Sequence, residues 1–229
     1  MPPLPLKKLL LVDDHPLLIA GLEKLIGNQP ELCVCGTAAN VRDALALAGE
    51  LKPDLVIADL TLPGRNGLEL VKDLAALHPE LPVIIFSMHD EMVYAERVLR
   101  AGGRGYVMKD TPPERLMEAI RTALSGEVFA SKKVTGNLLR AFANGNGNGN
   151  GKNHAAGCFS LECLTDRELE VFGLIGQAKS NYDIAVQLGI SPRTLDAHRA
   201  HIREKLGFTE GNELTRHAIR WTEVGTMDS

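Results

Sequence analysis

The stretch Lys7-Lys8-Leu9-Leu10-Leu11-Val12-Asp13-Asp14-His15-Pro16 decides the fold of the first half of the chain. Its apolar residues, Leu9–Val12, run directly into two aspartates. A short strand that is apolar on both faces is typical of a parallel sheet covered by helices on its two sides. In such sheets ligands bind beyond the carboxyl ends of the strands, which is where these aspartates stand. The stretch therefore predicts a buried strand and one part of a site.

The same alternation of an apolar run and an amphipathic segment repeats through the region before residue 130. Strand-like runs occupy Lys8–Val12, Leu32–Thr37, Leu55–Ala58, Val83–Phe86 and Gly105–Met108. Between them, apolar residues recur at helical spacing over Pro16–Ile26, Val41–Leu51, Gly64–Leu77, Glu91–Ala101 and Pro112–Leu124. Strict alternation of strand and helix predicts a doubly wound α/β domain with a five-stranded parallel sheet.

A run of Asn-Gly dipeptides, Asn144–Gly151, divides the chain. Such a tract has almost no side chain to bury and high backbone freedom, so it is typical of a flexible linker. We expect one domain over residues 1–130 and a second over residues 158–229. Residues 131–157 between them should hold a connecting helix, Ser131–Phe142, and the linker.

The region after the linker shows no strand pattern, and its periodicity predicts a small all-α domain of four helices. These are expected over Asp166–Gln177, Asn181–Leu188, Pro192–Leu206 and Glu213–Val224. Thr165 followed by Glu168 forms a capping box, and Ser191-Pro192 is a helix cap with proline in the first turn. The short break Gly189-Ile190-Ser191 has the length of the turn in a helix-turn-helix.

Length and composition exclude several classes of protein. A chain of 229 residues with 45% hydrophobic and 24% charged residues is expected to form two modest globular domains, and it is not fibrous or wholly disordered. No apolar run approaches the roughly 18 residues that span a bilayer, and Leu9–Val12 is too short for a signal peptide. We therefore expect a cytoplasmic protein without a membrane partner. The net charge of −4 does not by itself indicate binding to nucleic acid.

The four cysteines are expected to be reduced thiols, as is usual in the cytoplasm. Cys33 with Cys35 and Cys158 with Cys163 form two close pairs, which make a poor disulfide framework. His154, Cys158 and Cys163 also suggest a zinc site, but no fourth ligand follows at a usual spacing, so we disfavour this interpretation.

Polar residues follow four of the predicted strands. Each has a plain alternative on its own: Asp14 as a helix cap, Asp59 as a turn residue, Ser87 as a loop hydroxyl and Lys109 as a surface charge. Their joint placement at strand ends favours a site instead. With Asp13, which precedes Asp14, the set holds three carboxylates. Three carboxylates in one pocket repel one another, which favours a divalent cation, and Mg²⁺ suits oxygen ligands. A carboxylate can also attack a phosphoryl group, whose oxygens Lys109 and Ser87 would then stabilise.

The first 120 or so residues resemble the receiver domains of two-component response regulators, which have a flavodoxin-like fold. The motifs that carry the resemblance are Leu11–His15, Leu55–Gly67, Ser87–Asp90 and Gly105–Lys109. It implies that Asp59 accepts phosphate from a sensor histidine kinase. It also implies that Mg²⁺ is held by Asp14, Asp59 and the backbone carbonyl of Thr61, with Asp13 acting through water. Ser87 and Tyr106 would be the switch pair. His15 and His89 are expected to be surface neighbours without a catalytic role.

The second domain resembles the tetrahelical helix-turn-helix domain of the NarL/FixJ and LuxR regulators. The matching residues include Leu164–Val171, Ser180-Asn181, Ile190-Ser191, Thr194-Leu195 and Lys205-Leu206. The resemblance implies that the third helix enters the major groove of double-stranded DNA. The DNA contacts are then expected at Ser191, Arg193, Thr194, Asp196, Ala197, Arg199, Ala200, His201, Arg203 and Lys205.

The charges and apolar positions of this helix refine the expected DNA-binding face. Residues 191–206 carry a local excess of positive charge. They hold four basic residues, Arg193, Arg199, Arg203 and Lys205, and two acidic ones, Asp196 and Glu204. Leu195, Ile202 and Leu206 should lie in the core, and His198 should be packed. The sequence departs from the family at Asp196, where relatives often carry a basic residue, and at Ala178, where they usually have a helix-ending glycine.

The sequence thus predicts a phosphorylation-controlled, DNA-binding transcriptional regulator that acts as a homodimer and catalyses only its own phosphorylation and dephosphorylation. One alternative stays open: a signalling adaptor whose helical domain binds protein, because its DNA face is weakly basic. A metal-dependent phosphatase is more remote, since the motifs provide no separate substrate cleft.

Overall fold

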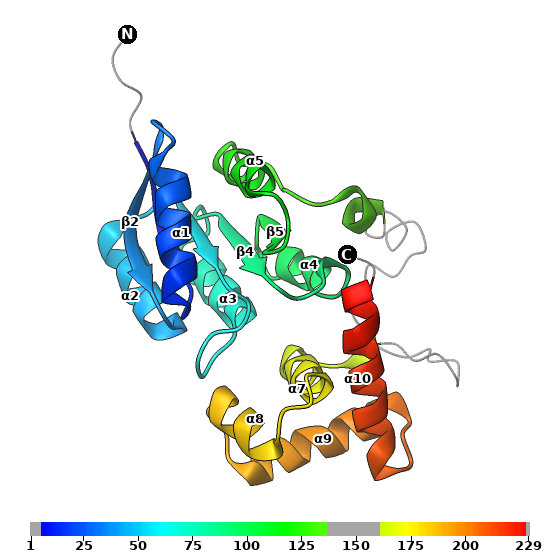
Figure 1. Ribbon diagram of the computed structural model, residues 1–229. Coiled ribbons are helices and arrows are strands. Elements are labelled where there is room, and N and C mark those ends of the chain that lie inside the picture. The colour runs from blue at the N-terminus through cyan, green and yellow to red at the C-terminus, as the bar shows by residue number, and fades with distance from the viewer. Residues whose placement is uncertain (1–5, 137–160, 228–229) are drawn as a thin grey trace. The chain divides into compact units, whose positions relative to one another are not determined.

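The computed structural model describes residues 6–136 and 161–227 (Figure 1). The chain divides into two compact units, Met1–Gly147 and Asn148–Ser229. Residues 132–136 are helical, as expected for the start of the connecting helix. The rest of that helix, the Asn-Gly run, and the suggested zinc ligands His154 and Cys158 lie outside the described residues.

The first unit is built on a five-stranded sheet in which every neighbouring pair of strands is parallel. The strands are β1 (Lys7–Val12), β2 (Leu32–Ala38), β3 (Leu55–Ala58), β4 (Val83–Ser87) and β5 (Gly105–Met108). Their order is β2-β1-β3-β4-β5, so the chain moves first to one side of β1 and then to the other. The switch point of a doubly wound sheet lies there, between β1 and β3. The predicted fold class is confirmed.

Helices cover both faces of this sheet. They are α1 (Pro16–Gly27), α2 (Val41–Leu51), α3 (Gly67–Leu77), α4 (Glu91–Arg100) and α5 (Pro113–Leu124) (Figure 1). One core cluster joins α1 and α5 to alternate residues of the strands, such as Leu9 and Leu11. The residue between them, Leu10, is also fully buried, because α2, α3 and α4 pack side by side over the other face.

Most element boundaries fall within two residues of the prediction, but α3 begins at Gly67 rather than Gly64. Gly64 has φ +80°, which a right-handed helix does not allow. Asn66 then caps the helix, and its side-chain oxygen accepts a hydrogen bond from Glu69 N. The three residues before Gly67 therefore belong to a turn.

The second unit consists of a short 3₁₀ turn, Leu161–Cys163, and four helices. These are α7 (Asp166–Gly176), α8 (Asn181–Leu188), α9 (Pro192–Leu206) and α10 (Gly211–Met227). The capping box of Thr165 and Glu168 is present, and Ser191 caps α9 by accepting from Thr194 N. Helix α10 is longer at both ends than the predicted Glu213–Val224. None of the described helices combines the length and apolar character needed to cross a membrane.

Candidate functional site

The polar residues at the strand ends converge on one pocket at the carboxyl edge of the sheet. The hydrogen-bond ladder carries them there: Asp59 N donates to Val12 O at 2.8 Å, and Lys109 N donates to Ser87 O at 2.8 Å. These residues follow different strands, so only the parallel arrangement brings them together. The structure thus assembles the set that the strand boundaries predicted.

Lys109 is the cation at the centre of this pocket. Its Nζ lies 2.7 Å from Asp13 Oδ2 and 3.0 Å from Asp59 Oδ2. The three side chains are nearly inaccessible, with 9% of Lys109, 4% of Asp13 and 5% of Asp59 exposed. Buried charges of this kind require partners. One ammonium facing two carboxylates still leaves the pocket with an excess of negative charge.

The chemical state of Asp59 follows from its surroundings. Burial raises the pKa of its carboxyl above the ordinary value, although the Lys109 ammonium opposes the shift. Its other oxygen, Oδ1, accepts a hydrogen bond from Leu60 N at 2.7 Å. A buried carboxylate that is more basic than usual is a better nucleophile, provided that nearby positive charge keeps it ionised.

His15 is an exposed neighbour of the acidic group, and its imidazole contacts two of the aspartates. Its Nδ1 lies 2.8 Å from Asp13 Oδ1 and 2.9 Å from Asp14 Oδ1. Asp14 does not cap α1, so that alternative is wrong: the cap residue is His15, and no side chain caps the helix. The signal for His15 was its position directly after the aspartate pair.

The acidic group has a composition that fits a hard divalent cation. One ligand atom from each of Asp13, Asp14, His15 and Asp59 lies within 4.8 Å of all the others. Three of these donors are carboxylate oxygens, which Mg²⁺ prefers, and exposed Asp14 leaves room for the waters that this ion retains. The residues present therefore fit Mg²⁺.

The loop from β3 to α3 is held tightly against Asp59. A Cβ atom at Gly67 would lie 2.1 Å from the backbone oxygen of Asp59, a distance that no side chain tolerates. Gly67 N also donates to Leu60 O at 2.7 Å. Thr61, within this loop, has its hydroxyl 2.9 Å from Nε2 of His89. The loop therefore has little freedom where it passes the pocket.

Ser87 and Tyr106, the expected switch pair, are both buried. The Ser87 hydroxyl accepts a hydrogen bond from His89 N at 3.3 Å, and the Tyr106 hydroxyl donates to His89 O at 2.7 Å. Burial raises the pKa of Tyr106 well above its ordinary value, so the hydroxyl keeps its proton and acts as a donor. The sequence named His89 only as a neighbour of the site, and its backbone bonds to both Ser87 and Tyr106 were not predicted.

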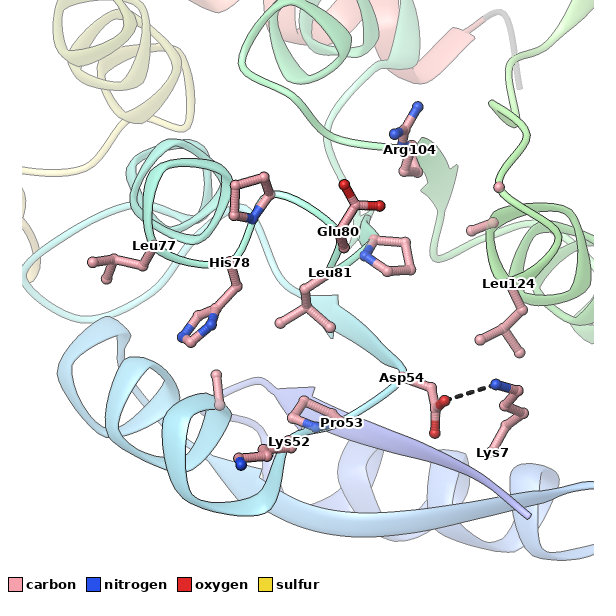
Figure 2. Close-up of a pocket in the computed structure, with 15 residues that line it drawn as sticks. Lys7, Lys52, Pro53, Asp54, Leu77, His78, Glu80, Leu81, Arg104 and Leu124 are labelled. Carbon is pink, nitrogen blue, oxygen red and sulfur yellow. Dashed lines mark hydrogen bonds and ion pairs between the residues drawn. The ribbon is translucent and has the colours of Figure 1, made fainter. Parts of the chain in front are cut away.

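A hollow in the first unit lies at the opposite, amino edge of the sheet (Figure 2). It measures about 650 Å³, and Lys7, Asp54 and Arg104 line it from the starts of β1, β3 and β5. Figure 2 shows the ion pair between Lys7 and Asp54 at its margin. None of the predicted site residues lies there.

In the second unit, α9 presents its polar face outward. Ser191, Arg193, Thr194, Asp196, Ala197, Ala200 and His201 are exposed, and Arg199 and Arg203 are half-buried. Leu195 and Ile202 are fully buried as expected, whereas Leu206 is only half-buried. Among the described side chains, no ion pair within 4 Å joins Asp196 to Arg193 or Arg199. Arg199 donates to Asn181 Oδ1 at 3.1 Å.

Lys205 has a partner inside the unit. Its Nζ lies 2.6 Å from Oε2 of buried Glu168, and the same oxygen accepts a hydrogen bond from Thr165 N at 2.8 Å. Burial acts to raise the pKa of Glu168, but the bonds from Lys205 and Thr165 outweigh burial and hold it below its ordinary value. The ammonium of Lys205 is therefore part of the helix cap of α7.

Two families match this chain. "Response regulator receiver domain" matches residues 9–121, and "Bacterial regulatory proteins, luxR family" matches residues 162–218. The oxygen regulatory protein NreC of Staphylococcus aureus strain JH9 is 35% identical over 93% of this chain and 97% of its own length.

Solved structures agree with these matches. A LuxR-family two-component response regulator from Aurantimonas sp. SI85-9A1 is 33% identical, with a TM-score of 0.56, over 60% of this chain and 99% of that one. RcsB of Salmonella typhimurium, a response regulator, is 20% identical with a TM-score of 0.68 over 95% of this chain and 98% of its own, which shows a shared fold.

Proposed function

The chain belongs to the two-component response regulators that join a receiver domain to a LuxR-type DNA-binding domain, and we propose that its Asp59 accepts a phosphoryl group from a histidine kinase. The observation that carries this assignment is the pairing of buried Asp59 with Lys109 beside Asp13. Burial raises the pKa of the Asp59 carboxyl above its ordinary value, which makes this carboxylate a better nucleophile than an exposed one.

Each residue of the pocket has a separate role in the proposed phosphoryl transfer. An oxygen of Asp59 forms the new P–O bond as the P–N bond to the imidazole of the donor breaks. The Lys109 ammonium and the Ser87 hydroxyl donate hydrogen bonds to the phosphoryl oxygens. Asp14, Asp59 and the backbone carbonyl of Thr61 would hold Mg²⁺, with Asp13 acting through water. The bound ion would supply positive charge against the phosphoryl oxygens.

The switch would follow from the same transfer. Ser87 turns toward the phosphoryl group, and Tyr106 fills the space behind it. The buried position of Tyr106 and its bond to His89 O support this role. The protein has no other substrate in this proposal: it is a switch whose only chemistry is its own phosphorylation and dephosphorylation.

Helix α9 is the DNA-reading element in this proposal, and the phosphorylated chain binds as a homodimer. Dimers of helix-turn-helix proteins read two half-sites about one helical turn apart. One solved relative, RcsB from Salmonella enterica, is bound to a promoter in the presence of the phosphomimetic BeF₃⁻. The residues proposed to face the groove or its phosphates are Ser191, Arg193, Thr194, Asp196, Ala197, Arg199, Ala200, His201, Arg203 and Lys205.

Intact-mass measurement after incubation with acetyl phosphate and Mg²⁺ tests the phosphorylation site. The unmodified chain should gain one phosphoryl group, and Asp59→Asn should gain none. Asp110→Asn is the matched control, because Asp110 is an exposed aspartate that lies next to Lys109 in the sequence. Undiminished labelling of Asp59→Asn would refute the assignment.

A mobility-shift assay tests the DNA-binding part of the proposal. The phosphorylated full chain should shift promoter DNA, and the affinity should fall as the salt concentration rises. Binding that is indifferent to both phosphorylation and salt would contradict control by the receiver.

A further inference from the structure

His89 contacts four separate parts of the receiver. Its Nε2 lies 2.9 Å from the hydroxyl of Thr61, in the loop from β3 to α3. Its backbone N–H donates to the Ser87 hydroxyl, and its backbone carbonyl accepts from the Tyr106 hydroxyl. Its ring packs against Tyr94 of α4, with centroids 5.3 Å apart and planes tilted by 49°. One half-buried residue thus joins the pocket, the switch pair and a helix.

These contacts place His89 where it can transmit a movement of the Thr61 loop to Tyr106 and α4. Its imidazole is fixed between Thr61 on the pocket side and Tyr94 on the helix side. A displacement of the loop that carries Thr61 therefore moves the ring and, through the short side chain, the His89 backbone. The backbone carbonyl holds the buried Tyr106 hydroxyl at 2.7 Å, so Tyr106 senses the same displacement. A chain of packed groups and hydrogen bonds of this kind can transmit coupling between two sites.

We propose that His89 is a positioning residue that carries the phosphorylation-dependent change from the loop at Thr61 to Tyr106 and α4. The proposal rests on the proposed function, because it assumes that the phosphoryl group and its cation engage Asp59 and the Thr61 carbonyl. It assigns the coupling to one hydrogen bond, between Nε2 of the imidazole and the Thr61 hydroxyl. His89 takes no part in forming the phosphoryl bond.

Two substitutions separate this hydrogen bond from the packing of the ring. His89→Phe keeps an aromatic ring against Tyr94 but has no nitrogen to bond to Thr61. His89→Gln loses the ring but places an amide at a reach similar to that of Nε2. Both variants keep the backbone groups that bond to Ser87 and Tyr106. If His89 acts only by packing its ring, His89→Phe should behave like the unmodified chain. If the hydrogen bond to Thr61 carries the coupling, His89→Gln should keep the coupling and His89→Phe should lose it.

The experiment compares amide hydrogen exchange of the full chain with and without beryllofluoride and Mg²⁺. In the unmodified chain, the ligands should change exchange over residues 88–100, which hold the loop after β4 and α4. In His89→Phe, the ligand-induced change should shrink about three- to tenfold, the range expected for the loss of one hydrogen bond. His89→Gln should restore most of it. Both variants should still gain one phosphoryl group by intact mass and keep the circular dichroism of the unmodified chain.

Two results would overturn the coupling. The first is a change over residues 88–100 in His89→Phe equal to that of the unmodified chain. The second is a loss in His89→Gln as large as in His89→Phe, which would make ring packing responsible. An unmodified chain that takes up neither a phosphoryl group nor beryllofluoride would overturn the proposed function itself, and the coupling with it.

Discussion

Replacing Lys205 with methionine should destabilise the helical unit and leave the receiver unchanged. Methionine keeps the apolar stem of lysine but removes the ammonium that lies 2.6 Å from Glu168 Oε2. Glu168 is 3% exposed, and its remaining close partner on that oxygen is Thr165 N at 2.8 Å. The substitution therefore leaves a buried carboxylate short of positive charge.

The size of the effect follows from the geometry. A hydrogen bond to a charged group is worth about 1.5–3 kcal/mol, and a buried carboxylate without its partner is costly. Because the side chain of Lys205 is 35% exposed, solvent screens part of this energy, and we expect a loss of about 1–2 kcal/mol. For a unit of this size, each kcal/mol lowers Tm by about 4–8 °C.

The pH dependence provides a second, independent signature. The pKa of Glu168 lies below its ordinary value of 4.5 in the folded chain. A carboxyl whose pKa is depressed by folding stabilises the fold above its unfolded pKa, and this contribution is lost as the pH falls through the folded value. The difference in stability between the unmodified chain and Lys205→Met should therefore be full at pH 7 and shrink below about pH 4.5.

The fluorescence of Trp221 gives the assay. Trp221 is the only tryptophan of the chain, and it packs against Phe172 of α7 with ring centroids 5.6 Å apart, so it reports on the helical unit. Lys179→Met is the matched control, because the ammonium of Lys179 forms a hydrogen bond to the neutral side chain of Gln187 and no ion pair among the described residues. A Tm equal to that of the unmodified chain at pH 7, or a deficit that persists undiminished in acid, would refute the reasoning.

Three further substitutions have expected outcomes. Gly67→Ala should destabilise the receiver by about 1–3 kcal/mol in chemical denaturation and slow labelling of Asp59, because the new Cβ meets the Asp59 backbone oxygen; a fully labelled and equally stable variant would contradict the close approach. Ala178→Gly should stabilise the helical unit by up to about 1 kcal/mol in the Trp221 assay, since Ala178 has φ +56°; a loss of stability would count against backbone strain there. Asp196→Ala should relax base preference at one position of each half-site by about 1–3 kcal/mol in selection from a random DNA pool, and identical preferences would exclude base reading by Asp196.

The pocket at the carboxyl edge of the sheet could be predicted because each of its residues stands directly beside a recognisable strand in the sequence. Asp13, Asp59 and Lys109 each follow an apolar run directly, so the end of a strand places them once the sheet is parallel. The turn before α3 could not be predicted in the same way. Gly64 fits a helical pattern, and only the approach of Gly67 to the Asp59 backbone requires a turn there.

Contacts between side chains from distant segments could not be predicted from the sequence either. Thr61 and His89 are 28 residues apart, and Glu168 and Lys205 are 37 residues apart. The sequence predicted Lys205 as a groove contact from its place on α9, but it did not show that the ammonium lies 2.6 Å from Glu168 Oε2. Periodicity shows which face of a helix a residue occupies, but the partner on that face depends on the packing of the other helices.

The hollow at the amino edge of the sheet makes the receiver suitable for protein engineering. Its rim includes the turn His78-Pro79-Glu80-Leu81-Pro82, which leads into β4 at the end remote from Ser87 (Figure 2). A fluorescent dye or a small inserted domain in this turn would leave the carboxyl edge, with Asp59 and Lys109, untouched. The sheet would connect such a reporter rigidly to the pocket, so the chain is a scaffold for a sensor whose label and chemistry occupy opposite ends of the same strands.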